Sequence, residues 1–147
     1  MNKMNFDLND SEVNINDTED NEDEIDLTPA EVIELMEEAW INEKFAPEIL
    51  PHKSELVEAL LGQISHMEEN LRDVESIDFK NSIHQLEVDR LRFLVSSYLR
   101  TRLEKIETYV AHILQQEEQR IERGNELYLT EQELQFAKNF SEGRCYQ

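Results

Sequence analysis

The stretch from Phe79 to Glu118 contains neither glycine nor proline, and it restricts the possible folds of this chain more than any other segment. Its apolar residues recur every three or four positions, which is the spacing of one face of an α-helix. At about 1.5 Å per residue, such a helix would reach roughly 60 Å. The face that it would bury consists of Val88, Leu91, Val95, Leu99, Leu103, Ile106, Val110 and Ile113.

The first half of this expected helix is apolar on a second side as well. A helix that is apolar nearly all round needs cover on most of its sides. We therefore expect the first half to be buried, either by the rest of the chain or by a partner. The residues of this second set are Ile83, Leu86, Phe93, Leu94 and Tyr98.

An earlier helix is predicted to begin in the segment Leu27–Glu31. Threonine caps a helix, proline suits its first turn, and a glutamate three residues after the cap completes a capping box. Pro47 disfavours helix before it, so this helix should end near Phe45. We expect Trp40 to be a core anchor, with a binding role as the alternative, because a single tryptophan on an apolar stripe usually packs inside. The stripe consists of Val32, Met36, Ala39 and Trp40.

Two further helices follow from the same reasoning. One carries Leu56, Leu60, Ile64, Met67, Leu71 and Val74 at helical spacing. The other begins with a second capping box at Leu129–Leu134 and should end at Gly143. The stretch 119–128, with Gly124 and Asn125, is predicted to be a polar loop.

The low number of turn-forming residues sets the fold class. The chain has only three glycines and three prolines, and no strand-like alternation persists anywhere in it. The sequence therefore predicts an all-α helical bundle with one long central helix. We divide the chain into an acidic tail at 1–26, a helical domain at 27–140 and a C-terminal tail at 141–147.

The tail at 1–26 carries ten acidic residues against one lysine, with few large apolar residues. Such a segment cannot bury enough apolar surface to offset the entropy lost on ordering, so we expect it to be disordered. A tail of this kind either stays solvated or docks onto a partner.

The overall charge and composition exclude several classes of function. A formal net charge of −20 repels phosphate backbones, so general or sequence-specific binding to nucleic acid is not expected. No window approaches the roughly 18 apolar residues that would span a bilayer. The single cysteine, Cys145, excludes an internal disulfide framework and indicates an intracellular compartment.

The motifs of the common helical enzymes are missing. A carboxylate-bridged di-metal bundle needs two Glu-x-x-His pairs, and none of the four histidines is preceded by such a glutamate. The His-Glu-x-x-His helix, the nucleophile elbow and the glycine-rich phosphate loop are absent too. We therefore expect no catalytic residue, no metal site and no cofactor, and a protein that works by binding other proteins.

Arg92 and Arg102 are predicted to project into the apolar stripe of the long helix. An unpaired charge there would be costly, so we expect both to pair with carboxylates, within the fold or across a subunit interface.

Several strings of the sequence are similar to the Sld-five family of GINS subunits. They are AWINEKFAPEIL (39–50), HMEENLR (66–72) and SIHQLEVDRLRFLVSSYLRTRLEKIE (82–107). LTPAEVIELMEEAW before them and LYLTEQELQFAKNF after them fit the same family, so the resemblance covers about residues 27 to 140.

The resemblance implies a non-catalytic, nuclear subunit of a heterotetramer. Its other members would be three Psf-type subunits, and the assembly would stabilise the eukaryotic replicative helicase, with its Mcm ring, during initiation and elongation. In that picture some residues of the long helix lie in or near packing with a sister subunit, although ordinary packing within the domain is an equal alternative. These residues are Phe93, Tyr98, Arg92, Arg100 and Arg102.

The resemblance is incomplete at the C-terminal end. Family members continue into a small β-rich domain, whereas this sequence ends with Ser141–Gln147, so we expect that domain to be absent. An engineered fragment, a short isoform and a divergent product all fit this difference.

The main alternative is a self-contained helical adaptor or homodimer that is unrelated to replication, in which the long helix pairs with its own copy. Sustained heptads would favour it, whereas the stripe observed here drifts between three- and four-residue steps.

Overall fold

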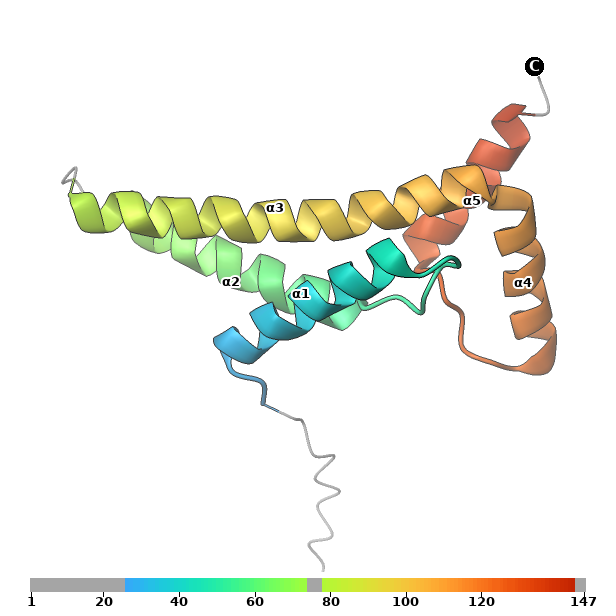
Figure 1. Ribbon diagram of the computed structural model, residues 1–147, viewed down its shortest axis with the longest axis horizontal. Helices are drawn as coiled ribbons and strands as arrows, with labels where there is room; N and C mark the ends of the chain where they lie inside the picture. Colours follow the sequence, from blue (N-terminus) through green and yellow to red (C-terminus); the bar gives the residue numbers. More distant parts are fainter. Residues whose placement is uncertain (1–25, 74–77, 145–147) are drawn as a thin grey trace, which may run out of the picture.

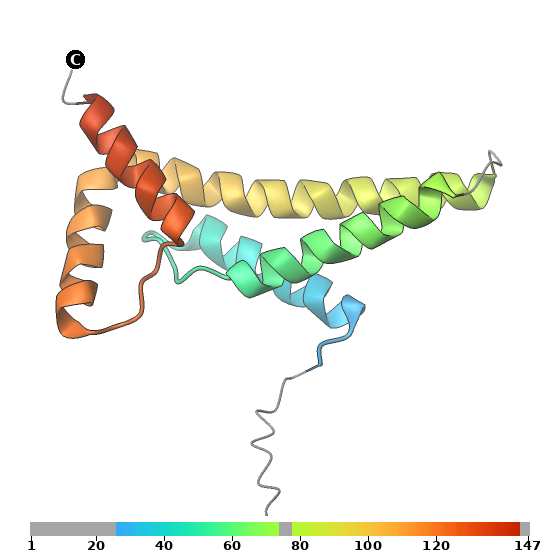
Figure 2. The same ribbon diagram turned by 180° about the vertical axis from the view of Figure 1, so that it is seen from behind.

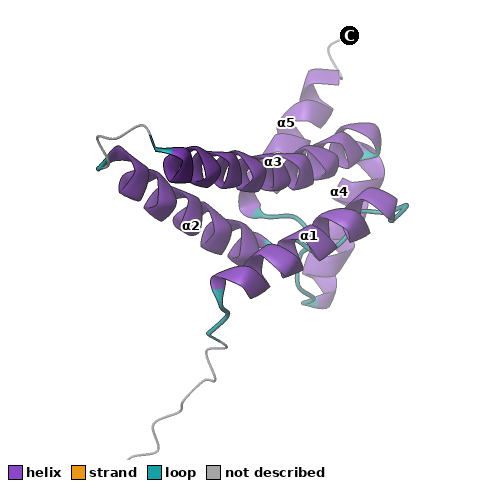
Figure 3. Ribbon diagram, turned by 60° about the vertical axis from the view of Figure 1, so that its left-hand side comes forward, coloured by secondary structure: helices purple, strands orange, loops and turns teal. Residues whose placement is uncertain are grey.

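Five helices make up the described part of the chain, which comprises residues 26–73 and 78–144 of a computed structural model. No strand occurs within these two ranges, so the predicted all-α class is confirmed (Figure 3). Residues 1–25 of the tail predicted at 1–26, Val74 and residues 145–147 lie outside the described residues. In chain order the helices are α1 (Pro29–Phe45), α2 (Ser54–Arg72), α3 (Phe79–Thr108), α4 (Val110–Arg123) and α5 (Glu131–Arg144).

Both predicted capping boxes are present. The hydroxyl of Thr28 accepts from the backbone N–H of Glu31, and the Glu31 carboxylate accepts from the backbone N–H of Thr28 at 2.8 Å. The pKa of Glu31 is lowered mainly by this backbone N–H and also by the Thr28 hydroxyl, which donates to the same carboxylate at 2.8 Å. At the start of α5, Thr130 and Glu133 exchange the same two hydrogen bonds, at 3.1 and 3.2 Å. Local sequence thus determines where α1 and α5 begin.

The long helix α3 is the central element, and both α1 and α2 pack against it (Figure 1). Apolar side chains from all three helices meet there in a first core cluster. Trp40 packs against the edge of this cluster and keeps part of its surface exposed. The buried members are Val32, Met36, Leu60, Ile64, Val88, Leu91, Leu94, Val95 and Tyr98.

A second core cluster lies at the other end of α3. Here α4 turns sharply away from the α3 axis, and α5 returns past the end of α3 (Figures 1 and 2). The two clusters divide the bundle into a three-helix part and a smaller part built by α4 and α5. The buried members are Ile49, Ile106, Val110, Ile113, Leu129 and Ala137.

The expectation of one uninterrupted helix from Phe79 to Glu118 is wrong. The helix breaks at Tyr109, whose backbone has φ −121° and ψ 30°. Thr108, Tyr109 and Val110 are β-branched or aromatic and have low helix propensity. A break in the helix at these residues therefore costs little free energy. The turn brings Val110 and Ile113 into the second core cluster, where a straight helix would carry them away from it.

Two other boundaries also differ from the predictions. Residues 119–123 belong to α4 and not to a loop, and α5 continues through Gly143 to Arg144. The loop begins at Gly124, which takes φ +69° and so caps α4 in the left-handed conformation that glycine adopts without strain.

The predicted buried face of α3 and α4 is largely confirmed. Six of its eight members are buried, whereas Leu99 and Leu103 are each 36% exposed. Of the second apolar set, Leu94 and Tyr98 are buried, but Ile83, Leu86 and Phe93 are exposed. The described part of the chain therefore leaves one side of the first half of α3 exposed.

Candidate protein interface

Arg102 lies at the junction of the two core clusters, with no exposed surface. Its Nε and Nη2 donate to the two oxygens of Glu133 at 2.8 and 2.9 Å, and its Nη1 donates to Glu43 at 3.2 Å. The carbonyls of Leu50 and Tyr128 accept at 2.6 and 2.8 Å. A guanidinium has five N–H donors, and all five are used here. Arg102 therefore ties α1, α3, α5 and two loops together.

The charge of Arg102 is kept despite its burial. Burial is the largest single effect, and it lowers the pKa of Arg102. The hydrogen bonds and charge of Glu133, together with the charges of Tyr98 and Glu43, outweigh burial, so the pKa of Arg102 is raised overall. The predicted pairing of Arg102 with carboxylates is confirmed, and it occurs within the fold. This corresponds to the intradomain alternative.

The sequence analysis did not identify which carboxylates are buried. Glu43 is 1% exposed and also accepts from Lys105 at 2.9 Å. Glu117 is equally buried, pairs with Arg120 and accepts from the backbone N–H of Tyr128 at 3.2 Å. The helical spacing of the sequence does indicate that these two glutamates lie on buried faces. Glu43 continues the stripe of α1 four residues after Ala39, and Glu117 continues that of α4 four residues after Ile113.

Tyr98 is also occupied inside the chain. It is 2% exposed, and its hydroxyl accepts from the backbone N–H of Lys53 at 3.2 Å. Burial, the largest cause, raises the pKa of Tyr98 against the opposing effect of Arg102. Tyr98 and Arg102 thus hold α3 in place from inside the fold, where both are buried.

The other three predicted interface residues lie on the surface of α3. Arg92 pairs with Glu68 on α2 and approaches Asp89 at 3.9 Å. Its pairing with carboxylates is confirmed, but its side chain is 52% exposed, so the expectation that it projects into the buried stripe is wrong. The reason is its position at the flank of the stripe, where a long side chain reaches solvent. Arg100 is exposed, and Phe93 is 63% exposed.

Phe93 belongs to an exposed apolar row that we call the α3 strip. Successive members are four, three and seven residues apart, so all lie on one face of α3. Phe79 is 79% exposed and Leu86 is 69% exposed, values unusual for large apolar side chains on one continuous face. The α3 strip consists of Phe79, Ile83, Leu86 and Phe93.

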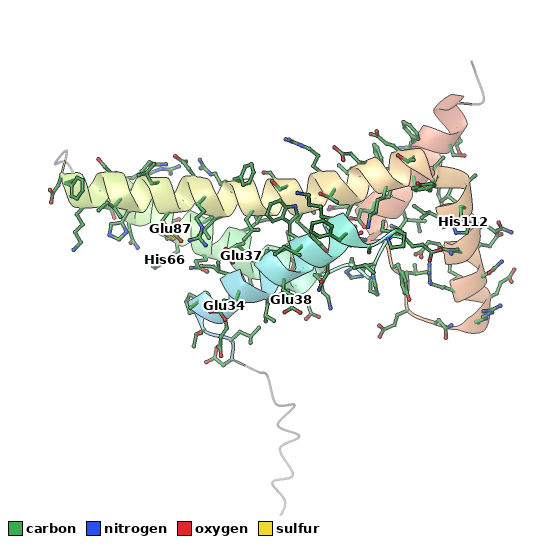
Figure 4. The ribbon with its side chains drawn as sticks, viewed as in Figure 1. Glu34, Glu37, Glu38, His66, Glu87 and His112 are labelled. Atoms are coloured by element: carbon green, nitrogen blue, oxygen red, sulfur yellow. The ribbon has the colours of Figure 1, made fainter. Side chains whose placement is uncertain are left out.

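Arg90 interrupts the α3 strip with a charge that is already neutralised. It pairs with Glu37 on α1 at 2.6 Å and with Glu87 at 3.2 Å, the two carboxylates labelled between the helices in Figure 4. The hydrogen bond that Arg90 donates to Glu37 is the main cause that raises the pKa of Arg90. Because these ion pairs neutralise the charge of Arg90, this face of α3 remains mainly apolar.

A cavity of about 480 Å³ lies on another side of α3, between α2 and α5. Leu61, Leu99, Leu103 and Phe136 contribute to its wall, and Tyr98 and Arg102 also line it. The partial exposure of Leu99 and Leu103 is therefore explained by a hollow next to the buried face.

Within the described residues, no group of three or more histidine, cysteine, aspartate or glutamate side chains could hold a metal ion. His66 on α2 and His112 on α4 lie at opposite ends of the molecule (Figure 4). None of the described helices is both long enough and apolar enough to cross a membrane.

Taken together, these features define a helical bundle domain whose longest helix has an uncovered apolar face. The chain belongs to the Sld5 family: a family model described as the GINS complex protein helical bundle domain matches residues 56–144.

Curated relatives carry the same family name. The chain is 51% identical over 124 residues to the human DNA replication complex GINS protein SLD5, covering 84% of this chain and 55% of that protein. The protein of the same name from Arabidopsis thaliana is 42% identical over 115 residues, covering 75% of this chain and 52% of that protein. The Schizosaccharomyces pombe protein is 33% identical over 78 residues, covering 50% and 36%. The chain thus spans about half the length of the first two of these relatives.

Proposed function

We propose that this chain acts in DNA replication as a non-catalytic subunit of the GINS heterotetramer. Its direct partners would be the three Psf-type subunits, and the assembly would act in the nucleus. There it would stabilise the replicative helicase, with its Mcm ring, during initiation and elongation. Family membership supports this proposal, as do the relatives named DNA replication complex GINS protein SLD5.

The observation that carries the proposal is the α3 strip. Exposed apolar patches of this kind mark sites of association, and the fully buried centre of an interface usually contains aromatic anchors. Phe93 is such an aromatic, braced from one side by Trp40 with ring centroids 6.2 Å apart and the planes at 83°. Arg92 and Arg100 flank this anchor, and polar residues of that type surround the apolar centre of many interfaces.

The proposal is tested by size-exclusion chromatography with mass determination, on the chain alone and mixed with the three Psf-type subunits. We expect a stable four-component complex. The double variant Leu86→Asp/Phe93→Asp should bind at least about tenfold more weakly, because two anchors lose their apolar burial and introduce charge. Both residues are exposed in the described structure, so the variant should keep its fold.

Ile121→Asp provides the matched control. Ile121 is 60% exposed on α4, away from the α3 strip, and its replacement should leave the complex yield unchanged. A chain that dimerises by itself and ignores the Psf-type subunits would contradict the proposal and favour the homodimeric adaptor. Equal weakening by the strip variant and by Ile121→Asp would show that the strip is not the contact surface.

A further inference from the structure

A groove of about 450 Å³ lies between the C-terminal half of α1 and the second half of α3. It continues the face of α3 that carries the α3 strip, since Phe93, Ser97, Arg100 and Glu104 follow one another at steps of four, three and four residues. The residues on which its chemistry depends are Trp40, Lys44, Arg100, Glu104, Lys105 and Tyr109.

The groove holds two cations that the described fold does not neutralise. Lys105 is engaged by Glu43 and by the carbonyl of Glu48. Lys44 and Arg100, in contrast, have no carboxylate partner within residues 26–73 and 78–144. The Nζ of Lys44 lies 5.6 Å from the centre of the Trp40 ring, a cation–π distance. Glu104 is the groove's own carboxylate.

Aromatic surface surrounds these cations. Phe45 is 76% exposed and Tyr109 is 53% exposed, and part of the Trp40 ring is accessible. A ligand that suits this groove therefore combines negative charge with apolar side chains.

We propose that residues 1–25 of this same chain dock in the groove between α1 and α3. This segment carries nine acidic residues and one lysine, interspersed with Phe6, Leu8, Val13 and Ile15. Residues 27–147 carry a formal charge of −11, so most of the surface repels the segment. The groove has two unneutralised cations and exposed aromatic side chains, so both electrostatic attraction and apolar contact favour binding of residues 1–25 there.

The connection is long enough. From Pro29 to Lys44, α1 covers about 22 Å at roughly 1.5 Å per residue. The eleven residues from Ile15 to Asp26 can extend to about 36–40 Å. Covalent attachment gives an effective concentration on the order of millimolar, so a contact is largely formed if its Kd is well below about 1 mM.

The test uses Trp40, the only tryptophan of the chain, as a probe inside the groove. Quenching of its fluorescence by acrylamide is compared between the full chain and a chain that lacks residues 1–25. We expect the quenching constant of the full chain to be about half that of the shortened chain. In 1 M NaCl, where the Debye length is about 3 Å, the full chain should approach the shortened one. Equal quenching of the two chains in low salt would overturn the proposal.

Charge variants of the full chain test the same proposal without removing residues 1–25. Lys44→Glu/Arg100→Glu should raise quenching to the level of the shortened chain. Lys80→Glu/Lys138→Glu changes the net charge equally at exposed sites outside the groove, and it should leave quenching unchanged. If both double variants have the same effect, the attraction is general and the groove is not the site.

Dilution separates this chain's own segment from that of a second copy. Docking within one molecule predicts quenching constants that do not change on tenfold dilution, whereas a dilution-dependent value would overturn the proposal in favour of exchange between copies. The inference does not rest on the proposed function. A partner that covers Phe93 and Arg100 would have to displace the segment.

Discussion

Arg102 donates every N–H of its guanidinium to acceptors inside the chain, which makes its neighbourhood sensitive to substitution. Arg102→Met would leave the buried Glu133 without a cation and Glu43 with Lys105 alone. Removing one partner of a buried ion pair costs about 3–5 kcal/mol, and we expect a loss of this size in the free energy of unfolding. Denaturant titration followed by circular dichroism measures it.

Arg92→Met is the matched comparison. It removes the same kind of side chain from the same helix, but the pair with Glu68 is half exposed. The expected loss in folding stability is therefore only about 0–1 kcal/mol. Similar losses for the two variants would contradict the central role assigned to Arg102. An effect of Arg92→Met on assembly remains a prediction of the proposed interface.

Tyr98 predicts a dependence of stability on alkaline pH. Burial raises the pKa of its phenol above the usual 10.0, so the unfolded chain ionises first as the pH rises. The stabilisation from Tyr98 is complete below pH 10 and is lost as the pH rises through the pKa of the folded state. Tyr98→Phe lacks this ionisation and also loses the Lys53 hydrogen bond, at a cost of about 1 kcal/mol at neutral pH.

The measurement compares unfolding free energies of the two proteins between pH 8 and pH 11. The free energy of unfolding of the unmodified chain should exceed that of Tyr98→Phe, and this difference should become smaller above pH 10. A difference that stays constant over this range would show that the phenol of Tyr98 does not titrate with unfolding.

At the scale of the element, the two capping boxes look equivalent in sequence but differ in their surroundings. Thr28→Ala and Thr130→Ala should each cost about 0.5–2 kcal/mol. Glu133, the partner of Thr130, also binds Arg102, whereas Glu31, the partner of Thr28, has no contact with Arg102. Thr28→Ala should therefore add to Arg102→Met within about 0.5 kcal/mol, and Thr130→Ala should not.

A double-mutant cycle by denaturant titration checks this difference. Equal additivity for both pairs would mean that Glu133 acts in its cap and in its ion pair independently.

The helix boundaries were not all equally predictable, although α1 does end at Phe45 as Pro47 predicts. The starts of α1 and α5 depend on residues within four positions of one another, so a local pattern is sufficient. The break at Tyr109 depends on the burial of Val110 and Ile113 against residues distant in sequence, among them Leu129 and Ala137. No local pattern contains that information, and the uninterrupted helix that we expected follows from periodicity alone.

At the scale of the whole molecule, the described helices form two apolar clusters joined by a buried ion-pair network. The network explains how α4 and α5 stay attached to the three-helix part, since Arg102 reaches Glu43 on α1 and Glu133 on α5. The α3 strip remains outside both clusters, and the proposed function assigns it to sister subunits. Exposed apolar surface of this extent is typical of an interaction site.

By itself, the sequence determined the all-α class, the starts of the capped helices and most of the buried face of α3, because capping and helical periodicity act between near neighbours in the chain. The site was only partly predictable. The pairing of Arg92 and Arg102 with carboxylates followed from the cost of an unpaired buried charge. The tertiary structure alone decided that Arg102 is enclosed while Arg92 is exposed, that Glu43 and Glu133 are its partners, and that the α3 strip is left uncovered. Each of these outcomes depends on how helices far apart in sequence cross, and crossing determines which sides of a helix lose contact with water.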